Sequence, residues 1–145
     1  MRGIFLPSLI LVLGGVCLAD DGSDRANLVG TWQPQDHSGA IWTIESSGGQ
    51  VHLTETENDR KVADFTCSAG SPCDVREPGS GVKISMWYNG PKLVVQETRG
   101  SKISRHRFHT VDNNTMEVEI VSIVPEGKTV VNRYARRTQS AGVKQ

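Results

Sequence analysis

Three polar side chains near the middle of the sequence could do chemistry together: Glu97, Ser104 and His106. A carboxylate, an imidazole and a hydroxyl are the parts of a catalytic triad, in which the histidine takes the proton of the serine. The sequence around Ser104 lacks the glycine-flanked turn that exposes such a nucleophile, and nothing in it predicts an oxyanion hole. We therefore interpret these residues, with Glu55 as a further candidate, as a hydrogen-bonded cluster or as ligand contacts, and predict that the protein is not an enzyme.

Alternating apolar and polar residues place this cluster on two predicted strands, residues 92–98 and 102–110, joined by a turn at Gly100-Ser101. Pairing Arg99 with Lys102 across the turn puts three pairs on the inner face: Leu93 with Phe108, Val95 with His106, and Glu97 with Ser104. The positions between them on the second strand then point outward, and we interpret them as a solvated face: Arg105, Arg107 and His109.

The same alternation continues along the chain and predicts an all-β protein. A first hairpin joins residues 40–45 to 51–55 through Gly48-Gly49 and sets Trp42 opposite Glu55. Further strands are expected in the Trp32 segment and at residues 61–67, 82–88, 116–120 and 129–137. Sequential short hairpins favour an up-and-down antiparallel barrel of about eight strands, and a two-sheet sandwich is the alternative. Because proline has no N–H, Pro91 predicts a turn longer than two residues after Asn89.

The first 19 residues predict an export signal. An apolar run from Ile4 to Val16 follows Arg2, is short for a bilayer span, and precedes the small residue Ala19. The alternative is a lipoprotein signal acylated at Cys17, which the bulky Val16 disfavours. We expect an exported protein, periplasmic or secreted, with a flexible polar lead-in at residues 20–27 and no integral membrane segment after signal cleavage.

Two cysteines remain after the signal, Cys67 and Cys73, with five residues between them. In an oxidising compartment this spacing favours a disulfide that closes a small loop and contributes about 2–3 kcal/mol. The alternative is a metal pair, which needs two further ligands close by. Residues 68–81 are rich in Gly, Ser and Pro and predict a long loop pinned by this disulfide.

The charge of the chain excludes some partners. Beyond residue 19 there are 15 basic and 16 acidic residues, so nothing attracts the protein to nucleic acid or anionic membranes. The four histidines lack the spacing of metal ligands: His37, His52, His106 and His109. We expect no metal, no cofactor and no nucleic-acid partner.

The opening of the strand series, Gly30-Thr31-Trp32, and the basic cluster at its end resemble the lipocalin and calycin arrangement. The likeness extends to small secreted bacterial lipocalin-like proteins of unassigned role, in which stretches like 82–93 and 116–128 recur. This resemblance implies that Trp32 closes the base of a barrel, which spans residues 28–138. A C-terminal tail at 139–145 is expected after the last strand. The resemblance also implies that an arginine of the last strand, Arg133 or Arg136, packs over the indole.

An inner face that mixes aromatic and polar groups is typical of ligand pockets. We therefore expect an exported monomeric barrel that binds a small, partly apolar molecule inside, lined by Trp42, Leu53, Met86, Tyr88, Val95, Glu97, His106, Phe108 and Tyr134, with Ile44 and Val118. The alternative is a filled barrel that inhibits or docks onto another exported protein, as some small disulfide-bonded protease inhibitors do. An enzyme working at Glu97 and His106 is the third hypothesis.

Overall fold

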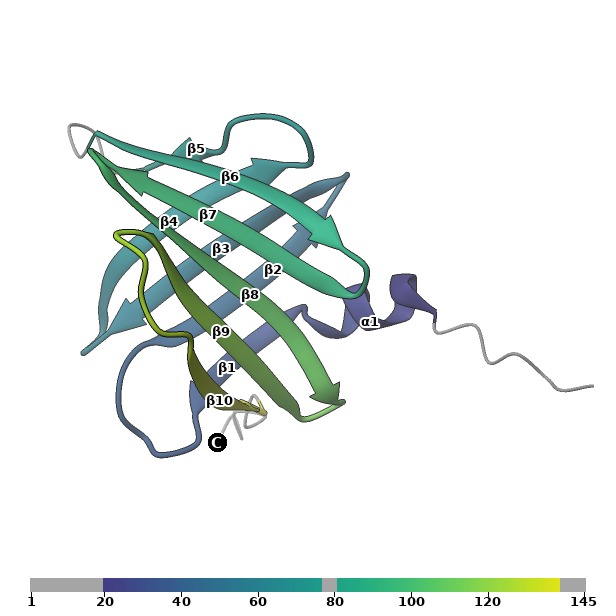
Figure 1. The fold of residues 1–145 in the computed structure, drawn as a ribbon. Helices are drawn as coiled ribbons and strands as arrows, with labels where there is room; N and C mark the ends of the chain where they lie inside the picture. The colour runs from purple at the N-terminus through teal and green to yellow at the C-terminus, as the bar shows by residue number, and fades with distance from the viewer. Residues whose placement is uncertain (1–19, 77–80, 139–145) are drawn as a thin grey trace, which may run out of the picture.

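The computed structural model describes residues 20–76 and 81–138, and the predicted signal peptide with Cys17 and the predicted tail at 139–145 lie outside them. Antiparallel strands wrap into a barrel, with one short helix beside it (Figure 1). The strands are β1 (Gly30–Pro34), β2 (Ile41–Ser47), β3 (Gln50–Glu57), β4 (Arg60–Ser68), β5 (Asp74–Val75), β6 (Val82–Asn89), β7 (Lys92–Arg99), β8 (Lys102–Asp112), β9 (Thr115–Val124) and β10 (Val130–Arg136).

All ten strands belong to one sheet in the order β5-β4-β3-β2-β1-β10-β9-β8-β7-β6. The two edges of this sheet meet, because the Cys73 N–H donates to the Ile84 carbonyl at 3.0 Å and Pro72 forms a bridge with Ser85. The sheet is therefore a nearly closed barrel, which confirms the predicted fold class. The strand count exceeds the expected eight, in part because the two-residue strand β5 lies inside the predicted loop at 68–81.

The predicted registers are confirmed in both hairpins. Trp42 faces Glu55 across β2 and β3, while Val95 faces His106 and Glu97 faces Ser104 across β7 and β8. The turn before β7 was predicted wrongly. Asn89 pairs with Lys92 directly, so the loop is the two residues Gly90-Pro91. A two-residue turn takes its hydrogen bonds from the flanking residues, so the missing N–H of Pro91 costs nothing there, and Gly90 supplies the positive φ of 60°.

The inward positions of the strands form one hydrophobic core. Its largest fully buried members are Trp32, Phe108, Leu28, Ile44, Leu53, Leu93, Met116 and Val118. Trp42 packs edge-on against Phe108, with ring centroids 5.1 Å apart. Aromatic pairs in this arrangement add to the stabilisation from buried area. The interior between the base and the middle of the barrel is thus filled by side chains.

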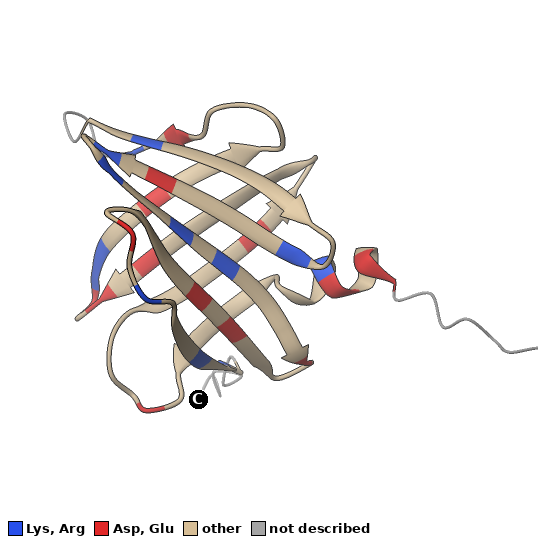
Figure 2. Cartoon of the chain, viewed as in Figure 1, with Lys and Arg blue, Asp and Glu red and all other residues tan. Residues whose placement is uncertain are grey.

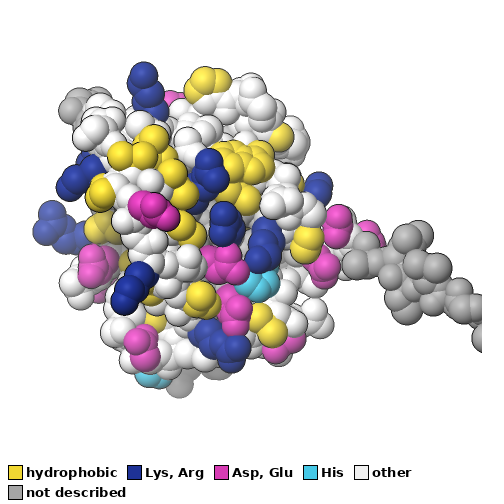
Figure 3. All heavy atoms as spheres, in the orientation of Figure 1, with side chains coloured by type: hydrophobic (Ala, Val, Ile, Leu, Met, Phe, Trp, Pro, Cys, Tyr) yellow, Lys and Arg dark blue, Asp and Glu magenta, His cyan; other side chains and the backbone are white. Residues whose placement is uncertain are grey.

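The outer face carries charges of both signs along the strands (Figure 2). His52 contacts two carboxylates on this surface, through Nδ1 to Glu45 at 3.0 Å and through Nε2 to Asp64 at 2.7 Å. Its expected pairing with Glu45 on the outer face is confirmed. Arg107 contacts Glu119, and Arg105 lies over the Trp87 ring at 5.6 Å. On the face shown in Figure 3, apolar side chains are correspondingly interspersed with basic and acidic ones.

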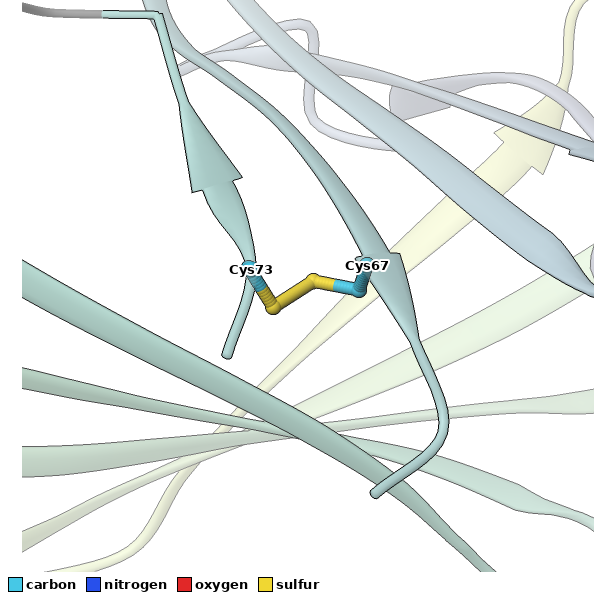
Figure 4. Close-up of a disulfide and its surroundings, with 2 residues drawn as sticks. All are labelled: Cys67 and Cys73. Carbon is cyan, nitrogen blue, oxygen red and sulfur yellow. A yellow bond between two sulfur atoms is a disulfide. The ribbon is translucent and has the colours of Figure 1, made fainter. Parts of the chain in front are cut away.

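The predicted disulfide between Cys67 and Cys73 is present (Figure 4). Cys67 belongs to β4, and Cys73 directly precedes β5 and donates the hydrogen bond to Ile84 of β6. The disulfide therefore holds the covalent loop at the seam where the two edges of the sheet meet.

The predicted flexible lead-in is wrong. Residues Asp21–Asn27 form the helix α1, whose first turn is capped by the Asp20 carboxylate, which accepts from the Gly22 N–H. Arg25 fastens the helix to the barrel, because its Nε donates to the Gly90 carbonyl at 2.8 Å and its guanidinium lies 4.5 Å from the Tyr88 ring centroid. The helix is held by polar contacts, and its sequence has no apolar period, so that sequence resembles a loop.

Candidate functional site

One end of the barrel is closed by Trp32, which is fully buried. The indole Nε1 donates to the Leu28 carbonyl at 2.8 Å, and the Arg136 guanidinium lies 4.2 Å from the ring centroid. Arg136 also donates to three backbone carbonyls, at 2.7 Å to Asn113, 2.7 Å to Val29 and 2.6 Å to Asn27. These bonds join α1, the β8–β9 turn and β10 into one closed base. A ligand site in the barrel is therefore expected at the opposite end.

Gly30 is required at this base by its close contact with Arg136. A Cβ placed on Gly30 would lie 2.5 Å from Nη1 of Arg136, and its φ of +146° is one that residues with a side chain rarely adopt. The glycine of the Gly-x-Trp motif therefore makes room for the guanidinium that covers the tryptophan.

Of the two arginines predicted to cover the indole, Arg136 does so and Arg133 does not. Arg133 lies three residues earlier on β10, on the outer face, where its Nη2 contacts Glu117 at 2.7 Å. Its side chain is 61% exposed. Residues along a strand alternate between its two faces, and Arg133 and Arg136 are three residues apart. Only one of the two side chains can therefore point into the barrel.

A cavity of about 530 Å³ opens at the end of the barrel opposite Trp32; we call it the mouth cavity. Its walls come from the connection after β1, from inner positions of β2, β3, β8 and β9, and from the first half of β10. The lining residues that carry its chemistry are Trp42, Glu55, His106, Ile120, Asn132 and Tyr134. Pro34 to Asp36 and Ser38 to Ala40 form the rim on one side. This volume is within the range of small-molecule sites.

The mouth cavity contains a carboxylate with no partner. Within residues 20–76 and 81–138, the Glu55 side chain forms no hydrogen bond or ion pair. Burial raises the pKa of Glu55 above its ordinary value of 4.5, and the negative charges of Glu57 and Glu97 raise it further. A carboxylate in a cleft whose pKa is shifted by burial is a candidate for a binding role, because the free protein gains no stability from it.

His106 and Tyr134 are neutral groups of this cavity. Burial lowers the pKa of His106 below 6.5, and the charge of Glu97 only partly opposes this. Burial likewise raises the pKa of Tyr134 above 10.0. At pH 7 the cavity therefore presents an uncharged imidazole and an uncharged phenol beside the Glu55 carboxylate.

The grouping of Glu97, Ser104 and His106 is not a catalytic triad. Among the described residues no hydrogen bond joins any two of them, and Glu97 instead accepts from Arg99 Nε at 3.2 Å. Glu97 and Ser104 line a separate hollow of about 280 Å³ beside Arg99, Lys102 and Pro125. Glu97 acts on the mouth cavity only through its charge, and the predicted hydrogen-bonded cluster is therefore wrong.

The other predicted lining residues lie elsewhere. Leu53, Met86, Val95 and Phe108 are buried in the packed core. Tyr88 lies at the base end, against Arg25 of α1. Of the nine predicted ligand contacts, Trp42, His106 and Tyr134 border the mouth cavity. The rim from residue 34 to 40 and Asn132 were not predicted as part of the site. Alternation identifies the inward face of a strand but not how deep a residue lies in the barrel.

The raised pKa of Glu55 predicts a stability change with pH. The folded chain binds the proton of the Glu55 carboxyl more tightly than the unfolded chain does. The ionised carboxylate therefore lowers the free energy of unfolding at neutral pH. This cost disappears as the pH falls through the pKa of Glu55 in the folded chain. Glu55→Gln should raise the free energy of unfolding at pH 7 by roughly 0.5 kcal/mol, a value reduced for the partial exposure of the group.

Urea unfolding at pH 7 and pH 4 measures this effect. The gain is expected at pH 7 and should vanish near pH 4, where the wild-type carboxyl is protonated. Glu126→Gln, which removes the same charge from the exposed 125–129 loop, is the matched control and should change neither value. A Glu55→Gln protein that is less stable than the wild type at pH 7 would contradict the assignment.

Comparison with solved structures tests the architecture. A secretory abundant heat soluble (SAHS) protein of Ramazzottius varieornatus aligns over 77% of this chain and 96% of its own, with a TM-score of 0.64 and 12% identity. SAHS protein 4 of that organism aligns over the same shares with a TM-score of 0.61 and 12% identity. A variant of the fluorescent protein UnaG aligns over 79% of this chain and 99% of its own, with a TM-score of 0.58 and 18% identity.

The fold is lipocalin-like. No family model and no curated protein matches the sequence, so the likeness is one of fold. None of the three similar structures is named as an enzyme. In the described part of this lipocalin-like barrel, no three His, Cys, Asp or Glu residues are placed to hold a metal ion. Over the same residues, the chain contains no helix with the length and apolar character of a membrane span.

Proposed function

We propose that this protein is an exported, non-enzymatic barrel that binds one small, partly apolar molecule in the mouth cavity. The observation that carries the proposal is the asymmetry of the barrel ends. Trp32 and Arg136 plug the base, while the other end holds a cavity of about 530 Å³ with aromatic walls and a partnerless carboxylate. The disulfide and the predicted signal peptide support export, and the likeness to small secreted bacterial barrels remains part of this proposal.

The alternative of a filled barrel that docks onto another exported protein has less support. It predicts an interior without a cavity and an exposed N-terminal segment that inserts into the partner. The open mouth cavity favours a ligand instead, and α1 is held against the barrel by Arg25. Trp42 and Tyr134 border the cavity and also belong to the packed core, so the ligand enters only the outer part of the barrel.

The test is native mass spectrometry of the protein purified from the cells that produce it. We expect a mass beyond that of the oxidised chain, present at one copy and released on unfolding. Ala40→Trp, which places an indole at the rim of the cavity, should abolish it. Ala135→Trp, on the exposed face of β10, is the matched control and should retain it. A bare wild-type chain that also takes up no small molecule in a thermal-shift screen would overturn the proposal.

A further inference from the structure

We infer that the ligand of the mouth cavity is an organic cation, a protonated amine or a quaternary ammonium group carried on an apolar body, with Glu55 as its counter-ion. This inference rests on the proposed function, because it names the class of molecule that the same cavity binds.

The charge of the cavity is negative and uncompensated. Among the described lining residues, Arg133 is the one cation, and its guanidinium is held at 2.7 Å by Glu117 on the outer face. Asp36 at the rim is occupied by Ser38, whose N–H and hydroxyl donate to it at 3.0 and 2.6 Å. Glu55 is thus the carboxylate left facing the cavity, and a cationic ligand supplies the charge that the protein does not.

The aromatic walls complement a cation as well. Trp42 lies directly opposite Glu55 across the β2–β3 ladder, and Tyr134 borders the same cavity from β10. Trp42 is held by edge contacts with Phe108 at 5.1 Å and His106 at 6.1 Å. Aromatic faces attract ammonium groups, and the attraction is stronger where water is excluded. Only 3% of Trp42 and 6% of Tyr134 is exposed, so the rings present small apolar areas to the cavity and Glu55 supplies the charge that recognises the cation.

The remaining polar groups do not favour an anion. His106 is half-buried, and burial disfavours the imidazolium that an anionic ligand would need. The titratable groups that border the cavity are Asp36, Glu55, His106, Arg133 and Tyr134, with Glu57 and Glu97 acting from further along β3 and β7. The charges of Glu57 and Glu97 already act on Glu55. These carboxylates would repel an anionic ligand.

The experiment compares three probes that share one phenyl body and differ in charge: 2-phenylethylammonium, 2-phenylethanol and 3-phenylpropanoate. Their dissociation constants for the full oxidised protein are measured by isothermal titration calorimetry at pH 7. We expect the ammonium probe to bind at least tenfold more tightly than the alcohol, and the carboxylate probe to bind most weakly. Glu55→Gln should weaken the ammonium probe at least tenfold and change the alcohol by less than twofold.

Glu126→Gln is the matched control, since it removes one negative charge outside the cavity and should leave all three constants unchanged. Ammonium binding that is unchanged in Glu55→Gln, or an alcohol or carboxylate probe that binds as tightly as the ammonium, overturns the inference while leaving the proposed function intact. If none of the probes binds, the ligand found by native mass spectrometry decides, because a neutral or anionic one overturns the inference and a cationic one supports it. If that ligand is absent too, both proposals fail.

Discussion

Replacing Trp32 by alanine is expected to lower the free energy of unfolding by about 3–5 kcal/mol, the range measured for large buried aromatic residues. The indole is fully buried, fills the base of the barrel and donates to Leu28 at 2.8 Å. Its removal leaves a cavity and also removes the surface on which the Arg136 guanidinium lies at 4.2 Å. Because small domains have only about 5–15 kcal/mol of stability, this one change removes a large part of it.

Urea unfolding followed by circular dichroism measures the loss. Trp32→Phe keeps a ring in the base but loses the bond to Leu28, so it should cost about 1–2 kcal/mol and remain folded. Trp87→Ala is the control, because this indole lies on the outer face of β6 over Val94 and is only half-buried. A Trp32→Ala loss no larger than that of Trp87→Ala would show that the base is not closed by Trp32.

The second large effect is expected for Arg136→Lys, which should cost about 2–3 kcal/mol although the charge is kept. The guanidinium reaches three carbonyls, on Asn27, Val29 and Asn113, from one planar group. A lysine ammonium is a point donor that cannot reach all three in that plane, and it stacks less well on the indole. The measured quantity is again the free energy of unfolding from urea titration.

Arg133→Lys on the same strand provides a control for the substitution itself. This arginine forms an exposed ion pair with Glu117, so the change should stay within about 0.5 kcal/mol. Similar losses in the two variants would contradict the special position of Arg136. Hydrogen exchange adds a local readout, because loss of the carbonyl bonds should increase exchange in α1 and in the β8–β9 turn before the rest of the barrel.

Local pattern was sufficient for the strands and their registers. Gly48-Gly49 and Gly100-Ser101 mark turns whose two-residue length aligns Ile44 with Leu53 and Val95 with His106. A side-chain period of two then decides which face each residue occupies. The same reasoning failed at α1, where the helix depends on a cap and on the contact of Arg25 with Gly90 from a distant turn. It failed at Pro91 because the hydrogen-bond demand of the turn was misjudged.

The sequence by itself determined the antiparallel strands and their inward residues, which include Trp42, Glu55 and His106, because alternation and turn chemistry are local properties. Cysteine spacing favoured the disulfide over a metal pair, and the lipocalin-like barrel was implied by the resemblance carried by Gly30-Thr31-Trp32. Only the tertiary structure decided which of the inward residues meet. Leu53 and Phe108 share the inward face with Trp42, yet they lie deeper in the packed core and have no part in the mouth cavity. Depth along the barrel, the closure of the base by Arg136 rather than Arg133, and the isolation of Glu55 all depend on how strands distant in sequence are staggered around the barrel.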